Sequence, residues 1–179
     1  MNTDILGWAV TGLLTSVLAP ALVLGTRLRI ACDHIALPAA LALPGFIAVH
    51  GLITLELAQH PAPPLWLGLH LPLLAGALIF WLPIFGHRTR LADPLRALYL
   101  LLSVPTLDFA GVLVIILGDP AGGVAMIVGM LPVGIIAIAV TWQWIYREEQ
   151  AAPTITFAHL PSTPEPDPDT SSHRPDGGG

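Results

Sequence analysis

The chain has 179 residues, of which 54% are hydrophobic and 11% are charged. Soluble domains carry about 25% charged residues, so this composition excludes an ordinary soluble domain. The formal net charge of −5 gives no information about partners, because much of the negative charge lies near the C-terminus and the rest of the chain is nearly neutral. The acidic residues near the C-terminus are Glu148, Glu149, Glu165, Asp167, Asp169 and Asp176. We therefore expect no nucleic-acid partner. The single cysteine, Cys32, excludes an internal disulfide and a multi-cysteine metal site.

Long apolar stretches alternate with short polar gaps along most of the chain. We predict five membrane spans, over residues 5–25, 35–57, 65–85, 97–117 and 121–146. Each is close to the ~20 residues that a helix needs to cross a bilayer, and helices satisfy their own backbone hydrogen bonds in lipid. The predicted fold is an all-α bundle of five transmembrane helices over residues 1–149. Asp4 stands where a signal peptide would carry basic residues, so we expect the first span to be retained.

All basic residues of the chain are arginines, and they follow only the first, third and fifth stretches. Cytoplasmic loops of membrane proteins carry an excess of Lys and Arg. The arginines therefore predict an outside N-terminus and a cytoplasmic C-terminus in a multi-pass protein of a bacterial cell membrane. They are Arg27 and Arg29, then Arg88, Arg90 and Arg96, and finally Arg147 and Arg174.

The character of the chain changes after the fifth span. Residues 150–179 are polar and rich in proline, serine and aspartate, with the run "STPEPDPDTSSHRPDGGG". Such a segment buries too little apolar surface to offset the entropy of ordering the chain. We predict a disordered cytoplasmic tail, in which His159 and His173 are solvated.

Several candidate metal ligands fall at one depth near the predicted outer surface. At 1.5 Å per residue, His50 and His70 lie roughly 10 Å and 8 Å below that surface, and Met126 lies at a similar level in the last span. His60 falls in the short outer loop between the second and third spans. Imidazole and thioether groups suit Cu(I), and zinc is less favoured because its usual cysteine and carboxylate partners are scarce.

A structural interpretation of the same residues stays open. A histidine within a span can simply form a hydrogen bond between helices, and methionines commonly fill gaps in cores. Asp108, near the middle of the fourth span, is the other conspicuous polar residue, because an ionisable group at that depth is costly and commonly functional. A proton or metal role competes there with a hydrogen bond to a histidine, to Thr106 or to Ser103.

Sequence motifs of catalysis are missing from the chain. It contains no G-x-x-x-x-G-K-[ST] loop, no G-x-G-x-x-G motif and no serine-centred nucleophile elbow. The gaps between spans are also too short to hold a catalytic domain. We therefore expect that the protein is not an enzyme.

Three stretches resemble the CtaG-like cytochrome c oxidase assembly factors. In "HLPLLAGALIFWLPIFGHRTRLADPLRALYLLLSVP" the matching positions are His70, Phe80, Trp81, Pro83, Gly86, Arg96, Tyr99 and Pro105. In "GDPAGGVAMIVGMLPVGIIAIAVTWQWIYREEQ" they are Asp119, Met126, Pro132, Trp144, Arg147, Glu148 and Glu149. The segment "VHGLITLELAQHP" adds His50, His60 and Pro61. The likeness runs collinearly from about residue 13 to residue 150.

The resemblance implies a role in assembling the haem–copper oxidase of a respiratory chain, as a copper chaperone acting on the outer side. Three departures stand against this. Members of the family usually have about seven spans, and a pair of histidines one turn apart is replaced here by Trp8 and Gly12. Leu69 also stands where the family has an acidic residue.

The sequence thus leaves three functions open. The first is an oxidase assembly factor that holds Cu(I) with His50 and His70, helped by Met126 and by His60. The second is an accessory or scaffold subunit of a membrane respiratory complex, without metal. The third is a small haem-binding electron carrier with His50 and His70 as axial ligands, or a transporter, although the paired repeats typical of secondary transporters are missing.

Overall fold

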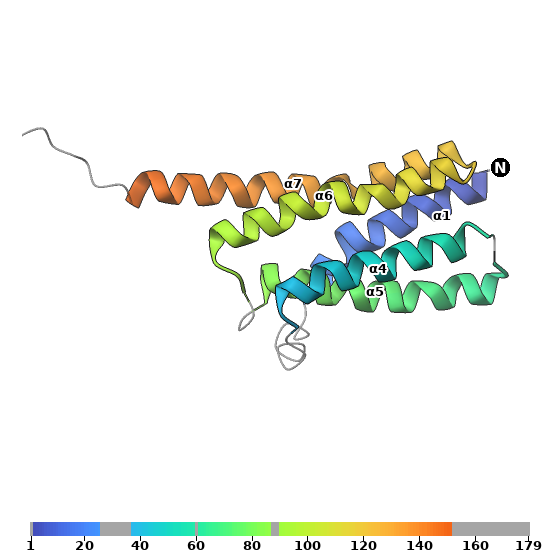
Figure 1. The fold of residues 1–179 in the computed structure, drawn as a ribbon, viewed down its shortest axis with the longest axis horizontal. Helices are drawn as coiled ribbons and strands as arrows, with labels where there is room; N and C mark the ends of the chain where they lie inside the picture. Colours follow the sequence, from blue (N-terminus) through green and yellow to red (C-terminus); the bar gives the residue numbers. More distant parts are fainter. Residues whose placement is uncertain (1, 26–36, 60, 87–89, 152–179) are drawn as a thin grey trace, which may run out of the picture.

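A computed structural model describes residues 2–25, 37–59, 61–86 and 90–151. All regular elements among these residues are helices. In chain order they are α1 (Asn2–Leu13), the π-helix η1 (Leu14–Leu18), α2 (Ala19–Gly25), α4 (Ala39–Leu57), α5 (Pro63–Phe85), α6 (Asp93–Ile116) and α7 (Pro120–Ala151). The first three follow one another without a break and form one long helical segment (Figure 1).

The described residues contain five helical segments that are long and apolar enough to cross a membrane: Ile5–Gly25, Ala39–Leu57, Pro63–Phe85, Asp93–Ile116 and Pro120–Ala151. Many of their large apolar side chains face outward, among them Leu71, Ile116 and Ile138, which are 69–72% exposed. Such a surface suits lipid contact, because lipid tails are as apolar as leucine. The predicted all-helical fold with five segments suited to crossing a membrane is confirmed for the described residues. The predicted tail and most of the arginine-bearing gaps lie outside the described residues.

Helix boundaries depart from the predicted spans where proline or charge intervenes. The second span begins at Ala39 rather than at residue 35, because Pro38 precedes the helix with an extended backbone (ψ 139°). The fourth begins at Asp93, four residues early, because Arg96 donates a hydrogen bond of 2.9 Å to Asp93 within the first turn. The fifth extends to Ala151, so α7 is about 48 Å long and exceeds the ~30 Å hydrocarbon core.

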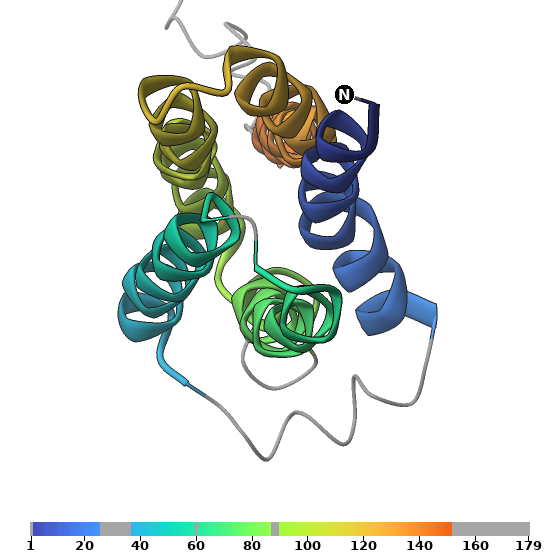
Figure 2. The same ribbon diagram turned by 90° about the vertical axis from the view of Figure 1, so that its right-hand side faces the viewer.

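The helices form a ring when the bundle is viewed end-on (Figure 2). α7 packs between α1 and α6, α6 also packs against α4, and α4 against α5, while α2 returns to contact α5 and completes the ring. Side chains from all five segments fill the centre. The largest fully buried ones are Trp81, Phe80 and Leu73, all from α5.

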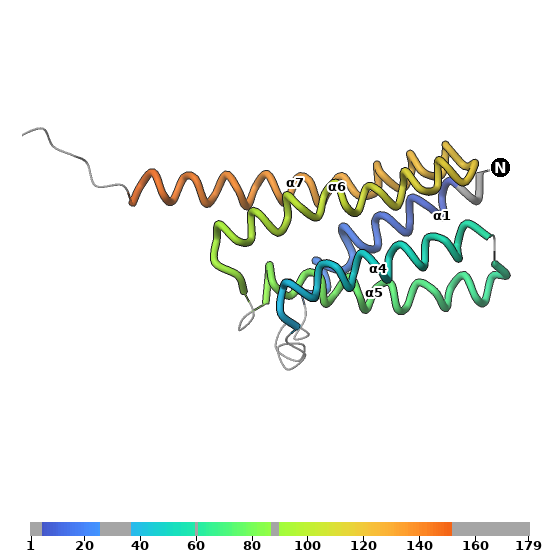
Figure 3. Tube along the Cα trace, in the orientation of Figure 1, coloured from blue at the N-terminus to red at the C-terminus, as the bar shows by residue number. Residues whose placement is uncertain are grey.

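The two ends of the bundle differ in charge. One end, here called the Asp119 end, holds the start of α1, the connection from α4 to α5 and the turn from α6 to α7 (Figures 1 and 3). The opposite end, here called the arginine end, carries Arg90, Arg96 and Arg147. α7 projects beyond the other helices at this arginine end (Figure 1). The described arginines therefore share one end, in keeping with the pattern in the sequence.

Glycines allow α7 to approach both of its neighbours closely. A Cβ atom at Gly12 of α1 would lie 2.8 Å from the carbonyl oxygen of Met126 and 3.0 Å from backbone atoms of Gly129. A Cβ at Gly123 would lie 2.4 Å from the carbonyl oxygen of Gly111 in α6. Small residues at these crossings let backbones pack against one another, which is how transmembrane helices gain van der Waals contact.

Candidate functional site

His50 is the most unusual polar residue of the bundle interior. It lies on α4, seven residues before the helix ends at Leu57, and is only 1% exposed. Neither ring nitrogen has a hydrogen-bond partner among the described residues, and the hydroxyl of Thr54, one turn further along, also lacks one. The nearest aromatic ring is that of Phe46, 5.5 Å away between centroids. Buried polar atoms in proteins are nearly always paired, so these three atoms require an explanation.

His70 occupies a matching depth on α5, seven residues after the helix begins at Pro63, but both of its nitrogens are engaged. Nδ1 lies 2.7 Å from the carbonyl oxygen of Trp66 and must donate to it. Nε2 lies 3.0 Å from the hydroxyl of Thr11 on α1. In the neutral ring Nδ1 therefore carries the proton, and the lone pair of Nε2 points toward Thr11.

This arrangement around His70 is the one that metal-binding histidines commonly show. Such residues donate one ring N–H to a carbonyl or carboxylate, which fixes the tautomer and aims the other nitrogen at the ion. The Trp66 indole packs beside the ring, tilted by 42° with a centroid distance of 4.1 Å, and restrains it further. Thr11 is a replaceable partner for Nε2, because its hydroxyl also lies 3.0 Å from the carbonyl oxygen of Gly7 and has a single proton to donate.

The two positions where the resembled family has histidines serve structural purposes here. The indole Nε1 of Trp8 donates to Oδ2 of Asp119 at 2.9 Å, and Oδ1 of the same carboxylate accepts from the backbone N–H of Gly122 at 2.8 Å. Asp119 thereby caps the start of α7 and fastens it to α1. Gly12 lies against the backbone of α7, so a histidine side chain has no room there.

The remaining candidate residues differ in how they are placed. Met126 and Met130 are buried on α7, at 1% and 3% exposure. Asp108 is half-buried on α6 and makes no side-chain hydrogen bond to a described residue. The hydroxyls of Ser103 and Thr106, expected as its partners, donate instead to backbone carbonyls of their own helix. His60 lies outside the described residues.

His50 and His70 are both buried, and each lies seven residues from the end of its helix nearest the Asp119 end, but they have separate contacts. No hydrogen bond or ring contact joins the two imidazoles. Within the described parts of the chain, no three side chains from His, Cys, Asp and Glu lie close enough to hold a metal ion together. A site here would therefore use few ligands, and its donors would be nitrogen and sulfur rather than carboxylate.

Sequence reasoning missed the hydroxyl residues of this region. Thr11 and Thr54 are fully buried beside the two histidines, at 1% and 0% exposure. Thr54 follows His50 by four residues, and residues at this spacing share one face of a helix, so the sequence could have predicted that Thr54 lies beside His50. No comparable signal identified Thr11, because it meets His70 from a different helix, 59 residues away in sequence.

Comparisons with protein-family models, with curated proteins and with solved structures found no match to this chain. We therefore base the functional proposal on the residues of the site.

Proposed function

We propose that this protein is a membrane-embedded copper-binding factor that holds Cu(I) inside the bundle through His50 and His70. The observation that carries the proposal is the pair of unpartnered nitrogens of His50 in an interior closed to solvent. A bound cation would pair with the ring nitrogen that holds the lone pair and so reduce the energetic penalty of burying the ring, and imidazole is among the ligands that suit copper.

The donor set supports Cu(I) over harder ions. His70 has a fixed tautomer with Nε2 free to exchange Thr11 for a metal, and Met126 adds a buried thioether at a similar depth. The carboxylates of Glu56 and Asp119 are not available as ligands. Glu56 is exposed, and Asp119 accepts hydrogen bonds from Trp8 and Gly122. Soft ligands without carboxylate favour Cu(I), which accepts low coordination numbers. Copper is here the cargo of the protein.

The proposed cellular role is the delivery of copper to a haem–copper oxidase during its assembly. It rests on the resemblance to CtaG-like assembly factors, together with the outside N-terminus that the arginine pattern predicts. In that orientation the histidines lie beneath the outer surface of a bacterial membrane, and the ion passes to an oxidase subunit during a transient contact between the two proteins. The protein would act as a carrier and not as a catalyst.

Metal analysis of the purified protein tests copper binding. Protein in detergent is incubated with Cu(I) under reducing conditions, and bound copper is measured after desalting for wild type, His50→Leu, His70→Leu and the double variant. We expect stoichiometric copper in wild type and none above background in the double variant. Met126→Leu should weaken binding, whereas Met130→Leu, a matched change one turn deeper, should not. Wild-type protein without copper would refute the proposal.

A second function, an accessory subunit without metal, is favoured by one observation: both nitrogens of His70 already have protein partners. In this case the protein would co-purify with an oxidase whether or not copper is present, and both histidine variants would retain that association. A Soret absorbance band in the pure protein would instead assign His50 and His70 to haem.

A further inference from the structure

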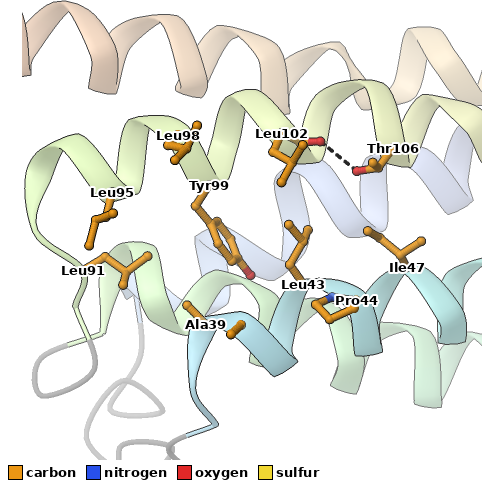
Figure 4. A pocket seen from close by; sticks show the side chains of 11 residues that line it. Ala39, Leu43, Pro44, Ile47, Leu91, Leu95, Leu98, Tyr99, Leu102 and Thr106 are labelled. Atoms are coloured by element: carbon orange, nitrogen blue, oxygen red, sulfur yellow. Dashed lines mark hydrogen bonds between the residues drawn. The ribbon is translucent and has the colours of Figure 1, made fainter.

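A long groove runs along the outside of the bundle between α4 and α6 (Figure 4). It has a volume of about 640 Å³ and is lined almost entirely by carbon. Its lining includes Ala40 and Leu43 from α4, and Leu91, Leu95, Tyr99 and Thr106 on the other side. It lies apart from His50 and His70 and takes no part in the copper proposal.

The polar groups of the groove are already satisfied. The Tyr99 hydroxyl donates to the carbonyl oxygen of Phe80 at 3.1 Å, inside the bundle. The Thr106 hydroxyl lies 2.9 Å from the carbonyl oxygens of Leu102 and Ser103, both on its own helix (Figure 4). The groove therefore offers no free donor, and its occupant along this length must be apolar.

The length of the groove favours an acyl chain over a helix. From Leu95 to Thr106 it follows twelve residues of α6, which is a rise of about 16 Å along the helix. This is half of the ~30 Å hydrocarbon core, or the depth of one leaflet. A transmembrane helix of a partner would need contact across both leaflets, whereas a lipid chain fits a groove that starts at the arginine end and stops near the midplane.

Three arginines gather at the headgroup level of that leaflet. Among the described residues, Arg90, Arg96 and Arg147 share one carboxylate, that of Asp93, at 3.8, 2.9 and 2.5 Å, while Glu148 and Glu149 follow Arg147 on α7. Arg96 is buried, with its side chain 7% exposed, and its Nε has no hydrogen-bond partner. Arg90 and Arg147 keep 45% and 58% of their side chains exposed. Guanidinium groups at this level attract anionic lipid headgroups.

The acyl groove and the arginines meet at one point of the fold. Leu91 lines the groove and directly follows Arg90, and Leu95 lines it directly before Arg96. We infer that the groove between α4 and α6 binds an anionic phospholipid, with one acyl chain along Leu95–Thr106 and its phosphate near Arg90 and Arg147. This inference holds whether or not the protein binds copper.

Native mass spectrometry of delipidated protein tests the inference. The protein is offered phosphatidylglycerol or phosphatidylcholine with identical acyl chains, and retained lipid is counted. We expect wild type to retain phosphatidylglycerol preferentially. Arg90→Gln with Arg147→Gln should lower the preference roughly tenfold, because each arginine near the surface adds attraction for an anionic lipid. Both arginines are exposed, so the double variant should fold, which circular dichroism checks.

A second variant tests the acyl groove independently of charge. Ala40→Phe places a ring in the groove and should reduce retention of both lipids severalfold. Ala139→Phe makes the same change on the exposed face of α7 and should leave retention at the wild-type level. Equal retention of the two lipids by wild type, or an Ala40→Phe variant that binds lipid as well as Ala139→Phe, would overturn the inference.

Discussion

The unpaired nitrogens of His50 predict that removing this histidine stabilises the protein when no metal is present. Leucine is close to histidine in volume and carries no polar atom. His50→Leu therefore eliminates the buried donor and the buried acceptor of the ring without opening a large cavity. Loss of a conspicuous polar residue normally destabilises a protein, so the expected sign is unusual.

The magnitude follows from the environment of the ring. An unsatisfied buried polar group costs about 1–3 kcal/mol, and His50 has two such atoms at 1% exposure. Against this gain stands the change of shape beside Phe46, which for apolar swaps of similar volume costs less than about 1.5 kcal/mol. We expect a net gain of roughly 0.5–6 kcal/mol in the free energy of unfolding.

Unfolding in mixed micelles by increasing mole fraction of SDS, followed by tryptophan fluorescence, measures this quantity. His70→Leu is the matched control, because it removes the same ring where both nitrogens are paired, and it should destabilise the protein. Adding Cu(I) should narrow the difference in stability between wild type and His50→Leu by stabilising only wild type. Wild type gains about 2.7 kcal/mol when the ion is present at a hundred times its dissociation constant, while His50→Leu gains little.

An equal loss of stability in metal-free His50→Leu and His70→Leu would contradict this prediction. That result would mean that the nitrogens of His50 are paired. It would remove the observation on which the copper proposal rests.

Three further predictions concern the packing around the site. Gly12→Ala should destabilise the bundle by about 1–3 kcal/mol in the same assay, because its Cβ meets the backbone of α7; Gly134→Ala, with nothing within 4 Å, should not. Trp81→Phe should cost about 1 kcal/mol through loss of the 2.9 Å hydrogen bond from its indole to the Thr15 carbonyl oxygen, whereas Trp142→Phe, at 71% exposure, should have no effect. Thr11→Val removes the hydroxyl that competes for Nε2 of His70, so Cu(I) affinity should rise up to about tenfold in a competition titration; a weaker affinity would show that Thr11 assists the site.

The helices could be predicted from the sequence because hydropathy and length alone decide whether a segment suits a bilayer. Their starts were harder to predict. Arg96 looked like a loop residue in the sequence, but pairing with Asp93 lets it enter the fourth span while buried. Charge in a span is tolerated once it is neutralised locally, and a hydropathy pattern does not show that.

The contacts of the site could not be predicted, because they depend on how each helix is rotated. The sequence shows Trp8 only as a residue in place of an expected histidine ligand. In the structure its indole donates a hydrogen bond to Asp119, 111 residues away in sequence. His50 and His70 fall at the same depth and differ entirely in their partners. Depth follows from counting residues, whereas the partner of a side chain depends on which neighbouring helix its face meets.

The π-helix η1 changes how this chain should be aligned with relatives. Its wider turn, from Leu14 to Leu18, takes in an extra residue, so helical phase is not preserved when positions are counted back from Ala19 and Pro20. Consider a regular α-helical span aligned with this one at Ala19 and Pro20. Its residue aligned with Gly12 by counting would lie where Thr11 lies here, facing His70. Superposition of structures, not residue counting from Ala19 and Pro20, is therefore the appropriate way to compare residues 2–13 with an unbroken α-helical span.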